Sequence, residues 1–344
     1  MSLPPSEIPL GAMRFNSDSQ KLEYWMGSAW MQIQTFSPNL DGGARGIIAG
    51  GGNYPAETNR IQFITIPTQG NSTDFGDLTQ AREGIGGMSN TTRAAFSQGG
   101  NYGSPLYNII DFITIPSTGN AQDFGDANDS VREATSAGSN HTRGLTAGGY
   151  SDSSNSNTDR IGAITFSTTG NAADFGNLVS GVREAWDGII STGIRGFNCG
   201  GVSPSFTDTI NMITIPTFGN AVDFGDLIKV GRQGGAVGNS TRGYLLGYSA
   251  PSDTFSNEIQ KLNLISGGNS TQTGECVVTR SQTGVSNPTR GVTCGGYTPS
   301  PAGNGSTIME YINFATEGDS VDFGDLTEGT EFAGGASNAH GGLG

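Results

Sequence analysis

The segment Ile61-Gln-Phe-Ile-Thr-Ile-Pro-Thr-Gln-Gly-Asn-Ser-Thr-Asp-Phe-Gly-Asp77 holds the pattern that decides the fold. Its first six residues alternate in polarity and are rich in β-branched and aromatic side chains, which suits a strand with one buried face. Gly70-Asn71 then predicts a hairpin turn, and a second strand would carry Asp74-Phe-Gly76. The segment therefore predicts a pair of antiparallel strands.

The Asp-Phe-Gly triplet recurs along the chain at a nearly constant interval. It begins at Asp74, Asp123, Asp174, Asp223 and Asp322, with intervals of 49, 51, 49 and 99 residues. The last interval is two periods, with a degenerate copy between them at 268–276. A second marker runs in phase, at Arg45, Arg93, Arg143, Arg195, Arg242 and Arg290. Self-similarity at this period predicts a repeat architecture of six units over residues 44–344.

Each repeat reads as four strands. The first precedes the marker Arg, as at 84–89 and 134–139, and turns at Ser-Asn. The second runs from the Arg to Gly-Gly, and a variable loop leads to the third. A Gly-Asn hairpin turn at Gly70, Gly119, Gly170 and Gly219 leads to the fourth. Four antiparallel strands per unit of this length predict an all-β, six-bladed β-propeller. Gly and Ala in the first two strands suit the crowded inner strands.

The two ends of the repeat region predict how the ring closes. Repeat one has no first strand before Arg45, because 36–43 reads as a loop. The chain instead ends with an additional first-strand segment at 331–338. This C-terminal strand is expected to complete blade one.

Composition excludes several classes of protein. Among 344 residues, 56 are Gly, which disfavours long helices. Only 14% are charged, which argues against a highly charged, intrinsically disordered chain. A net charge of −14 without a basic cluster argues against nucleic-acid binding. The chain contains no stretch of 18 apolar residues, so no membrane-spanning helix is expected. Residues 1–13 do not resemble a secretory signal. Three Cys are too few, and odd in number, for a disulfide framework, so folding in a reducing cytoplasm is expected. Cys199 and Cys294 are expected to be small core residues.

Residues 1–40 lie outside the repeat. Three Pro in 1–9 predict an extended arm, and three short strands are expected at 12–15, 21–25 and 30–34. This β-meander is too small for a core of its own. It presents four aromatic side chains, Phe15, Tyr24, Trp25 and Trp30. They form either a docking surface or a cap on one face of the propeller.

Two resemblances add to this reading. The run Arg143-Gly-Leu-Thr-Ala-Gly-Gly149, a variable loop and an Ile-x-x-Ile-x-Ile strand resemble a kelch-type propeller repeat over about 44–344. The kelch Trp is absent, and Phe of Asp-Phe-Gly would take over its packing. Kelch-type repeats often form peptide- or sugar-binding modules, and some belong to oxidases. Separately, Gly11-Ala-Met-Arg-Phe-Asn-Ser-Asp-Ser-Gln-Lys-Leu-Glu-Tyr-Trp25 resembles a short module of fibres and tail-associated proteins in tailed bacteriophages, especially marine cyanophages.

The sequence offers no catalytic residues and predicts no enzyme. Its two His, His141 and His340, sit at inter-repeat turns, which does not suit the copper site of a kelch-type oxidase or a hydrolytic triad. The sialidase-type Asp box is absent. No cofactor and no metal ion are expected, although calcium at the repeated Asp pairs, such as Asp74 and Asp77, stays open. The preferred reading pairs these Asp with a second Arg series, at Arg82, Arg132, Arg183, Arg232 and Arg280.

The loops after the second strand are the predicted binding region, because they gather on one face of a propeller. Their aromatic residues are Tyr54, Tyr102, Tyr107, Tyr150, Phe206, Tyr248, Phe255 and Tyr297. Aromatic side chains among Ser, Asn and Gly suit glycans or protein loops. The alternative is that each aromatic packs on its own blade.

Together with the phage resemblance, these features predict a non-enzymatic virion structural protein: a fibre, tail or capsid-surface component. Its N-terminal segment would dock on other virion proteins, and the propeller face would bind a virion neighbour or a host-surface glycan during host attachment. It would be present in several copies in a symmetric assembly, put together in the host cytoplasm. The alternative is a soluble carbohydrate- or protein-binding propeller module of bacterial origin.

Overall fold

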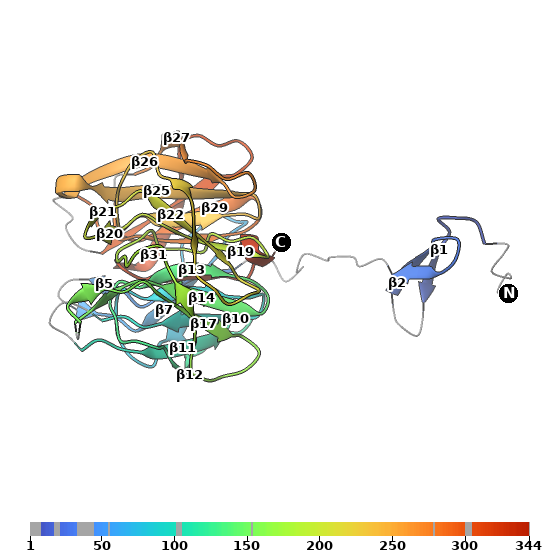
Figure 1. The fold of residues 1–344 in the computed structure, drawn as a ribbon, viewed down its shortest axis with the longest axis horizontal. Helices are drawn as coiled ribbons and strands as arrows, with labels where there is room; N and C mark the ends of the chain where they lie inside the picture. Colours follow the sequence, from blue (N-terminus) through green and yellow to red (C-terminus); the bar gives the residue numbers. More distant parts are fainter. Residues whose placement is uncertain are drawn as a thin grey trace. The chain divides into compact units, whose positions relative to one another are not determined.

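The computed structural model describes residues 8–16, 21–32, 45–53, 56–100, 105–152, 154–277, 279–299 and 305–343 (Figure 1). These residues form an all-β structure, with two short 3-10 turns, η2 (Pro251–Asp253) and η3 (Gly341–Leu343). None of these residues belongs to a helix that could cross a lipid bilayer. The chain divides into two compact units, Met1–Gly42 and Gly43–Gly344.

The first unit contains a three-stranded antiparallel sheet in the order β1-β2-β3. The strands are β1 (Met13–Asn16), β2 (Lys21–Trp25) and β3 (Trp30–Gln32). The predicted meander is confirmed, with boundaries shifted by one or two residues. The expected turn at 16–19 and most of the expected N-terminal arm lie outside the described residues.

The second unit contains six larger antiparallel sheets among its described residues, numbered here in chain order. Sheet 1 comprises β32 (Gly334–Ser337), β4 (Arg45–Ala49), β7 (Arg60–Thr65) and β8 (Thr73–Asp77), and sheet 2 comprises β9 (Gly86–Ser89), β10 (Arg93–Ser97), β11 (Ile109–Thr114) and β12 (Gln122–Asp126). Sheet 3 comprises β13 (Thr135–Ser139), β14 (Arg143–Ala147), β17 (Arg160–Thr165) and β18 (Ala173–Asn177), and sheet 4 comprises β19 (Arg195–Cys199), β22 (Thr209–Thr214) and β23 (Val222–Asp226). Sheet 5 comprises β24 (Gly235–Gly238), β25 (Arg242–Ala250), β26 (Thr254–Asn263) and β27 (Thr271–Glu275), and sheet 6 comprises β28 (Thr283–Ser286), β29 (Arg290–Cys294), β30 (Ser306–Asn313) and β31 (Val321–Thr330).

Three two-stranded hairpins extend the loops that follow the second strands. They are β5 (Gly52–Asn53) with β6 (Ala56–Glu57), β15 (Tyr150–Ser151) with β16 (Ser156–Asn157), and β20 (Val202–Ser203) with β21 (Ser205–Phe206).

Four strands in every repeat was a wrong prediction for sheet 4, which has three. Eight positions separate Glu184 from the turn residue Thr192, whereas six separate the equivalent Gly84 from Asn90. The longer segment makes only isolated bridges, including a parallel one between Asp187 and Gly235. Two extra residues break the register that a regular first strand needs.

The predicted pairing of the C-terminal strand is confirmed. β32 pairs antiparallel with β4, with Gly334 opposite Ala49 and Ser337 opposite Gly46. Asn338 Oδ1 accepts a hydrogen bond from Arg45 N at 2.8 Å. Asn90 makes the same bond with Arg93 inside one continuous chain segment. The two ends of the repeat region thus rebuild a turn that is local in the other repeats.

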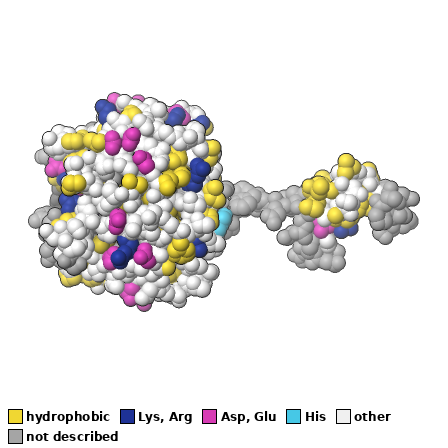
Figure 2. Space-filling model, in the orientation of Figure 1, with side chains coloured by type: hydrophobic (Ala, Val, Ile, Leu, Met, Phe, Trp, Pro, Cys, Tyr) yellow, Lys and Arg dark blue, Asp and Glu magenta, His cyan; other side chains and the backbone are white. Residues whose placement is uncertain are grey.

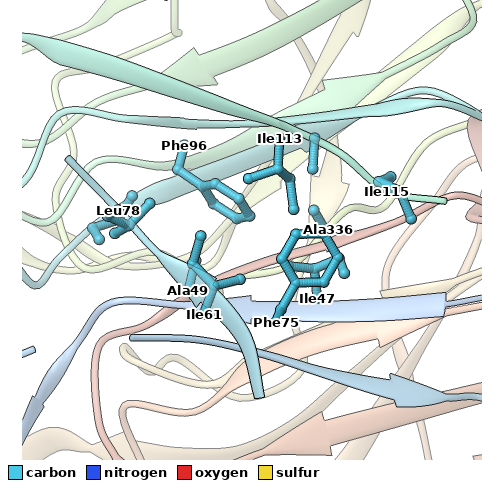
Figure 3. Close-up of a cluster of buried hydrophobic side chains, with 11 residues drawn as sticks. Ile47, Ala49, Ile61, Phe75, Leu78, Phe96, Ile113, Ile115 and Ala336 are labelled. Carbon is cyan, nitrogen blue, oxygen red and sulfur yellow. The ribbon is translucent and has the colours of Figure 1, made fainter. Parts of the chain in front are cut away.

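The core lies between neighbouring sheets. Figure 3 shows one such cluster, in which Ile47, Ile61 and Phe75 of sheet 1 meet Phe96 and Ile113 of sheet 2. The expected core role of Phe in Asp-Phe-Gly is confirmed, since Phe75 is 3% exposed.

Small residues line the contacts between the first strands, as predicted. β9 contacts both β13 and β32. A Cβ at Gly87 would lie 2.1 Å from the carbonyl oxygen of Gly335, so only Gly fits this crossing.

The prediction that Gly-Asn forms the hairpin turn was wrong. The turn comes earlier, where Thr68 N donates to Thr65 O. Gly70 and Asn71 instead extend along the outer strand of the preceding sheet. Gly70 N donates to Phe323 O at 2.9 Å, and Asn71 Oδ1 accepts from Asp325 N at 3.0 Å.

This Gly-Asn latch recurs between successive sheets. Its backbone bonds are Gly119 N to Phe75 O, Gly170 N to Phe124 O, Gly219 N to Phe175 O and Gly268 N to Phe224 O. Between sheets 5 and 6 the sequence is Gly318-Asp319, and Asp319 Oδ1 accepts from Glu275 N at 3.0 Å. The latch explains the Gly of Asp-Phe-Gly. Gly76 has φ +150°, and a Cβ there would lie 2.4 Å from the carbonyl oxygen of Gly119. The closely approaching backbone leaves no room for a side chain.

The marker Arg series joins the sheets a second time. Each Arg donates from Nη1 to a carbonyl oxygen after the third strand of the next sheet. The pairs are Arg45 with Ile115, Arg93 with Phe166, Arg143 with Ile215, Arg195 with Leu264, Arg242 with Phe314 and Arg290 with Ile66. We call these contacts the Arg clamps. They satisfy backbone carbonyls at strand ends that would otherwise lack partners.

His340 is buried beside the turn that leads to η3. Its Nδ1 accepts from Gly342 N at 3.1 Å, so Nε2 carries the proton and donates to Ser89 O at 2.9 Å. Burial lowers the pKa of His340 to about 4. The tail segment is therefore held by a neutral imidazole.

Gly76→Ala should lower the free energy of unfolding by roughly 2 to 4 kcal/mol, because a Cβ meets the neighbouring backbone and the positive φ is strained. Urea denaturation measures the loss. Gly193→Ala is the control, since a Cβ at that exposed position meets nothing within 4 Å. Equal stability of both variants would contradict the latch as described.

His340→Gln should make stability less dependent on pH between 7 and 4. The lowered pKa means that protonation favours unfolding, so the wild type loses stability as the pH falls from about 6.5 towards 4, by at most about 3 kcal/mol. Urea denaturation at pH 7, 5 and 4 compares the slopes, with exposed His141→Gln as control. A wild-type slope that persists in His340→Gln would refute this assignment.

Candidate binding face

Six equivalent positions form a ring just before the first strands. These positions, here the central ring, are Gly84, Glu133, Glu184, Gln233, Ser281 and Phe332, with φ between +54° and +66°. The left-handed backbone has a direct cause. Gly84 N donates to Phe332 O, Phe332 N to Ser281 O, Ser281 N to Gln233 O, Gln233 N to Glu184 O and Glu184 N to Glu133 O. Five non-Gly residues in this region represent strain that the hydrogen-bonded ring maintains.

The central ring surrounds a cavity of about 30 Å³, which holds about two water molecules. Half-buried Asp187 lines it and accepts from Thr283 Oγ1 at 2.6 Å. Burial raises the pKa of Asp187 to about 7. A cavity of this size cannot enclose an organic substrate.

Carboxylates near the ring are strongly desolvated. Burial, and then the charge of Glu184, raise the pKa of Glu133 to about 7. Burial, and then the charges of Glu331, Glu57 and Glu133, raise the pKa of Glu83 to about 8. These groups gain a proton near neutral pH.

The expected pairing of the Asp-Phe-Gly aspartates with the second Arg series was wrong. Arg82 is fully buried and pairs with Asp111 on β11 at 2.9 Å. The others pair on the loop side: Arg132 with Asp152, Arg183 with Glu133, Arg232 with Glu184 and Asp253, and Arg280 with Asp253. The Asp of the triplets lie on outer strands facing solvent. Asp123 Oδ1, for example, accepts from Gly125 N two residues on.

The Arg series covers the loop aromatics. Tyr150 lies beneath Arg132 and Arg183, with distances of 4.3 and 4.9 Å from ring centroid to guanidinium carbon. Arg280 lies 5.0 Å from both Phe255 and Tyr297, whose rings stack on one another.

Phe206 takes the equivalent place beside Arg232, at 5.5 Å. These four half-buried aromatics are thus held in cation–π contacts. They stabilise the loop face and present ring edges more than free ring faces.

The remaining predicted loop aromatics are placed differently. Tyr248 is 2% exposed and packs on Trp186, so its expected surface position was wrong. It belongs to the extended β25, whose length carries it into the core. Tyr107 is half-buried. Tyr54 and Tyr102 lie outside the described residues.

A groove of about 510 Å³ opens on the loop side beside sheets 2 and 3. It is lined by Pro105, Leu106, Asn128, Asp129, Ser130, Ser151 and Asp152. Two of its carboxylates are fixed by ion pairs, Asp129 with Arg160 at 2.8 Å and Asp152 with Arg132. The volume is in the range of small-molecule sites, and carboxylate, amide and hydroxyl groups beside Leu106 can hydrogen-bond a polyol.

Sequence reasoning missed this groove. One signal was present, because Asp129 follows the triplet at a position where other repeats have Gln80, Ser180 and Lys229. A break in an otherwise regular pattern marks a repeat with a distinct surface.

The predicted docking aromatics divide between the two faces of the small sheet. Phe15 is 65% exposed and Tyr24 37% exposed. Trp25 was expected to be exposed but is 7% exposed, because it packs on half-buried Trp30 at 5.4 Å.

No cluster of three or more His, Cys, Asp or Glu side chains suited to a metal ion occurs in the described part of the chain. His141 is exposed at a turn, whereas His340 is buried. Cys199 and Cys294 are buried free thiols, as expected, and burial raises the pKa of Cys199 to about 12.

Comparison with protein-family models gives no match to this chain, and comparison with curated proteins gives none either. The fold and the geometry of its surfaces therefore carry the functional argument.

Glu83→Gln should raise the free energy of unfolding at pH 8 by roughly 2 kcal/mol. The raised pKa means that folding favours the protonated acid, so the wild type loses stability as the pH rises from 4.5 towards 8. Thermal unfolding at pH 4.5 and 8 measures the difference, which should vanish at pH 4.5. Asp74→Asn, at an exposed site, is the control; a gain at pH 4.5 equal to that at pH 8 would refute the assignment.

Proposed function

We propose that the second unit is a closed, six-bladed, kelch-like β-propeller. The Gly-Asn latches and the Arg clamps support closure, because both series run from each sheet to its neighbour and include sheets 6 and 1. Arg290 of sheet 6 donates to Ile66 O, and Gly70 N donates to Phe323 O. The pairing of β32 with β4 adds a third link between the chain ends. A closed ring leaves no open sheet edge for aggregation.

We further propose that the protein is a non-enzymatic structural component of a tailed-phage virion, in a fibre, the tail or the capsid surface. The observation that carries this proposal is that the chain consists of two units with different properties. A small sheet that cannot bury its own apolar side chains precedes a large unit braced by repeated inter-sheet contacts. Such a chain suits docking at one end and display at the other. The likeness of 11–25 to a phage module supports the same assignment.

The loop face is the proposed binding surface for a virion neighbour or a host-surface glycan. Arg45 and Leu343, the ends of the described second unit, lie at the opposite ends of the strands from these loops. The loops are therefore unobstructed by the chain ends of this unit. Tyr150, Phe206, Phe255 and Tyr297 would supply ring edges there.

The groove near Asp129 and Asp152 favours a second candidate. A soluble carbohydrate-binding propeller module would use such a groove without any particle. Fixed carboxylates and hydroxyl groups suit sugar hydroxyls, which need several oriented acceptors.

A chain lacking residues 1–40 should fold but fail to enter particles of a tailed phage that encodes it. The large unit has its own core, and the docking sheet is lost. Mass spectrometry of purified particles compares the truncated and full-length chains, and circular dichroism checks folding. Normal incorporation of the truncated chain would refute N-terminal docking.

Two further outcomes separate the candidates. Absence of the full-length chain from purified particles would refute the virion assignment. Tight binding of the full-length chain to an immobilised glycan, lost in Asp129→Ala but retained in Asp74→Asn, would favour the carbohydrate-binding module.

A further inference from the structure

The small sheet has one face composed of apolar side chains. Alternate residues of a strand share a face, and directly paired residues on neighbouring strands share it too. Met13 pairs with Tyr24, and Tyr24 pairs with Met31. Phe15 pairs with Leu22. We call these five residues the apolar face.

The opposite face is already satisfied within the sheet. Glu23 is 4% exposed and accepts from Arg14 Nε and Asn16 Nδ2, both at 2.9 Å. These hydrogen bonds lower the pKa of Glu23. The Arg14 guanidinium lies 4.2 Å from the centroid of the Trp30 ring, which in turn packs on Trp25. The apolar face has no such arrangement of partners among the described residues.

The apolar face is exposed over a substantial area. Exposed fractions are 59% for Met13, 65% for Phe15, 37% for Tyr24 and 44% for Met31, and Met26 and Leu10 at its margin are 50% and 78% exposed. Figure 2 shows hydrophobic side chains at the surface of this unit. With about 200 Å² for a large apolar side chain, these six expose roughly 600 Å². A three-stranded sheet is at the lower limit of independent stability, and an exposed apolar patch of this size is typical of an interaction site.

We propose that a second copy of this sheet covers the apolar face, so that the chain dimerises through its N-terminal unit. Two copies would bury roughly 1,200 Å², the lower limit for a specific interface. Two such sheets pack face to face about 10 Å apart and form a small sandwich. The interface is isologous, because each copy offers the same residues to the other.

The absence of charge on the apolar face favours a second copy over a partner that binds through charge. The whole chain carries −14, which opposes association of identical copies. The apolar face itself contains no ionisable side chain apart from the Tyr24 hydroxyl, so its contact adds no repulsion between copies. A differently charged partner would find no complementary charge on it. The ion-paired Arg14 and Glu23 would point away from the contact, so in the dimer docking would use this polar face with Trp30 and not Phe15 and Tyr24.

The linker permits this arrangement. Twelve residues, 33–44, separate the described small sheet from β4, and a chain of that length reaches at most about 40 Å. A folded unit of about 300 residues has a radius of gyration near 19 Å. Two large units can therefore flank one shared sandwich. The inference goes beyond the proposed function, because it concerns contacts between copies and applies whether or not the chain belongs to a virion.

Sedimentation equilibrium of the full-length chain tests the proposal. The wild type should give twice the 35.5 kDa chain mass at micromolar concentrations. Phe15→Glu should raise the dissociation constant at least tenfold, since it places a charge in the buried contact. Gln32→Glu, at the position opposite Glu23 in the strand register and so on the other face, is the matched control and should remain dimeric. A wild type that stays monomeric at 100 μM overturns the proposal, as does an oligomer that Phe15→Glu leaves unchanged.

A second variant guards against loss of dimers through unfolding of the small sheet. Tyr24→Cys places a thiol at the centre of the apolar face, while the three native Cys are buried. Oxidation should give a disulfide-linked dimer for Tyr24→Cys and not for Gln32→Cys. Equal cross-linking of both variants, or none in Tyr24→Cys, overturns the proposal. Failure of particle incorporation would leave this result unaffected, so the two proposals fail separately.

Discussion

The outer edge of each sheet is the constraint on which the large unit depends. A fourth strand that carries Asp-Phe-Gly has one row of backbone groups without a partner in its own sheet, and such an edge is costly and prone to aggregation. The next repeat meets this need with Gly-Asn: Gly119 N reaches Phe75 O, and Asn120 Oδ1 accepts from Asp77 N. The close approach in turn requires Gly at 76. One backbone contact therefore accounts for two repeated sequence features.

Backbone hydrogen bonds between neighbouring sheets also determine the structure at the inner end of the sheets, although the residues involved are different. Residues of the central ring take left-handed backbone conformations, and five of the six donate their N–H to the ring residue that precedes the neighbouring sheet. Glu133 and Glu184 adopt this left-handed conformation, although it is strained for Glu and would not be strained for Gly. Their side chains then organise Arg132, Arg183 and Arg232, and the Arg hold the loop aromatics. These contacts link the loop aromatics to the strained backbone of the central ring.

The small unit differs from the large one because one face of its sheet is not covered. On one face Glu23 accepts hydrogen bonds from Arg14 and Asn16, while the apolar face around Phe15 has large exposed side chains. In the large unit every sheet face meets another sheet, so the same kinds of side chain are buried. Among the described residues no second layer covers the apolar face of the small sheet, whereas the sheets of the large unit cover one another.

The sequence by itself determined the repeat length, the all-β class, the strand order and the pairing of the C-terminal strand within 331–338 with the strand that begins at Arg45. These depend on local patterns: alternation for strands, Asx turns after Ser, and a missing first strand matched by an extra last one. It misplaced Gly-Asn in a hairpin turn and paired the aspartates of Asp-Phe-Gly with Arg82 and its equivalents. Those residues take partners from other sheets, some more than 200 positions away, and no local pattern records such a contact. The missing strand of sheet 4, the burial of Tyr248 and the groove at Asp129 were decided by packing between sheets, because whether a residue is covered depends on which neighbour the tertiary structure brings against it.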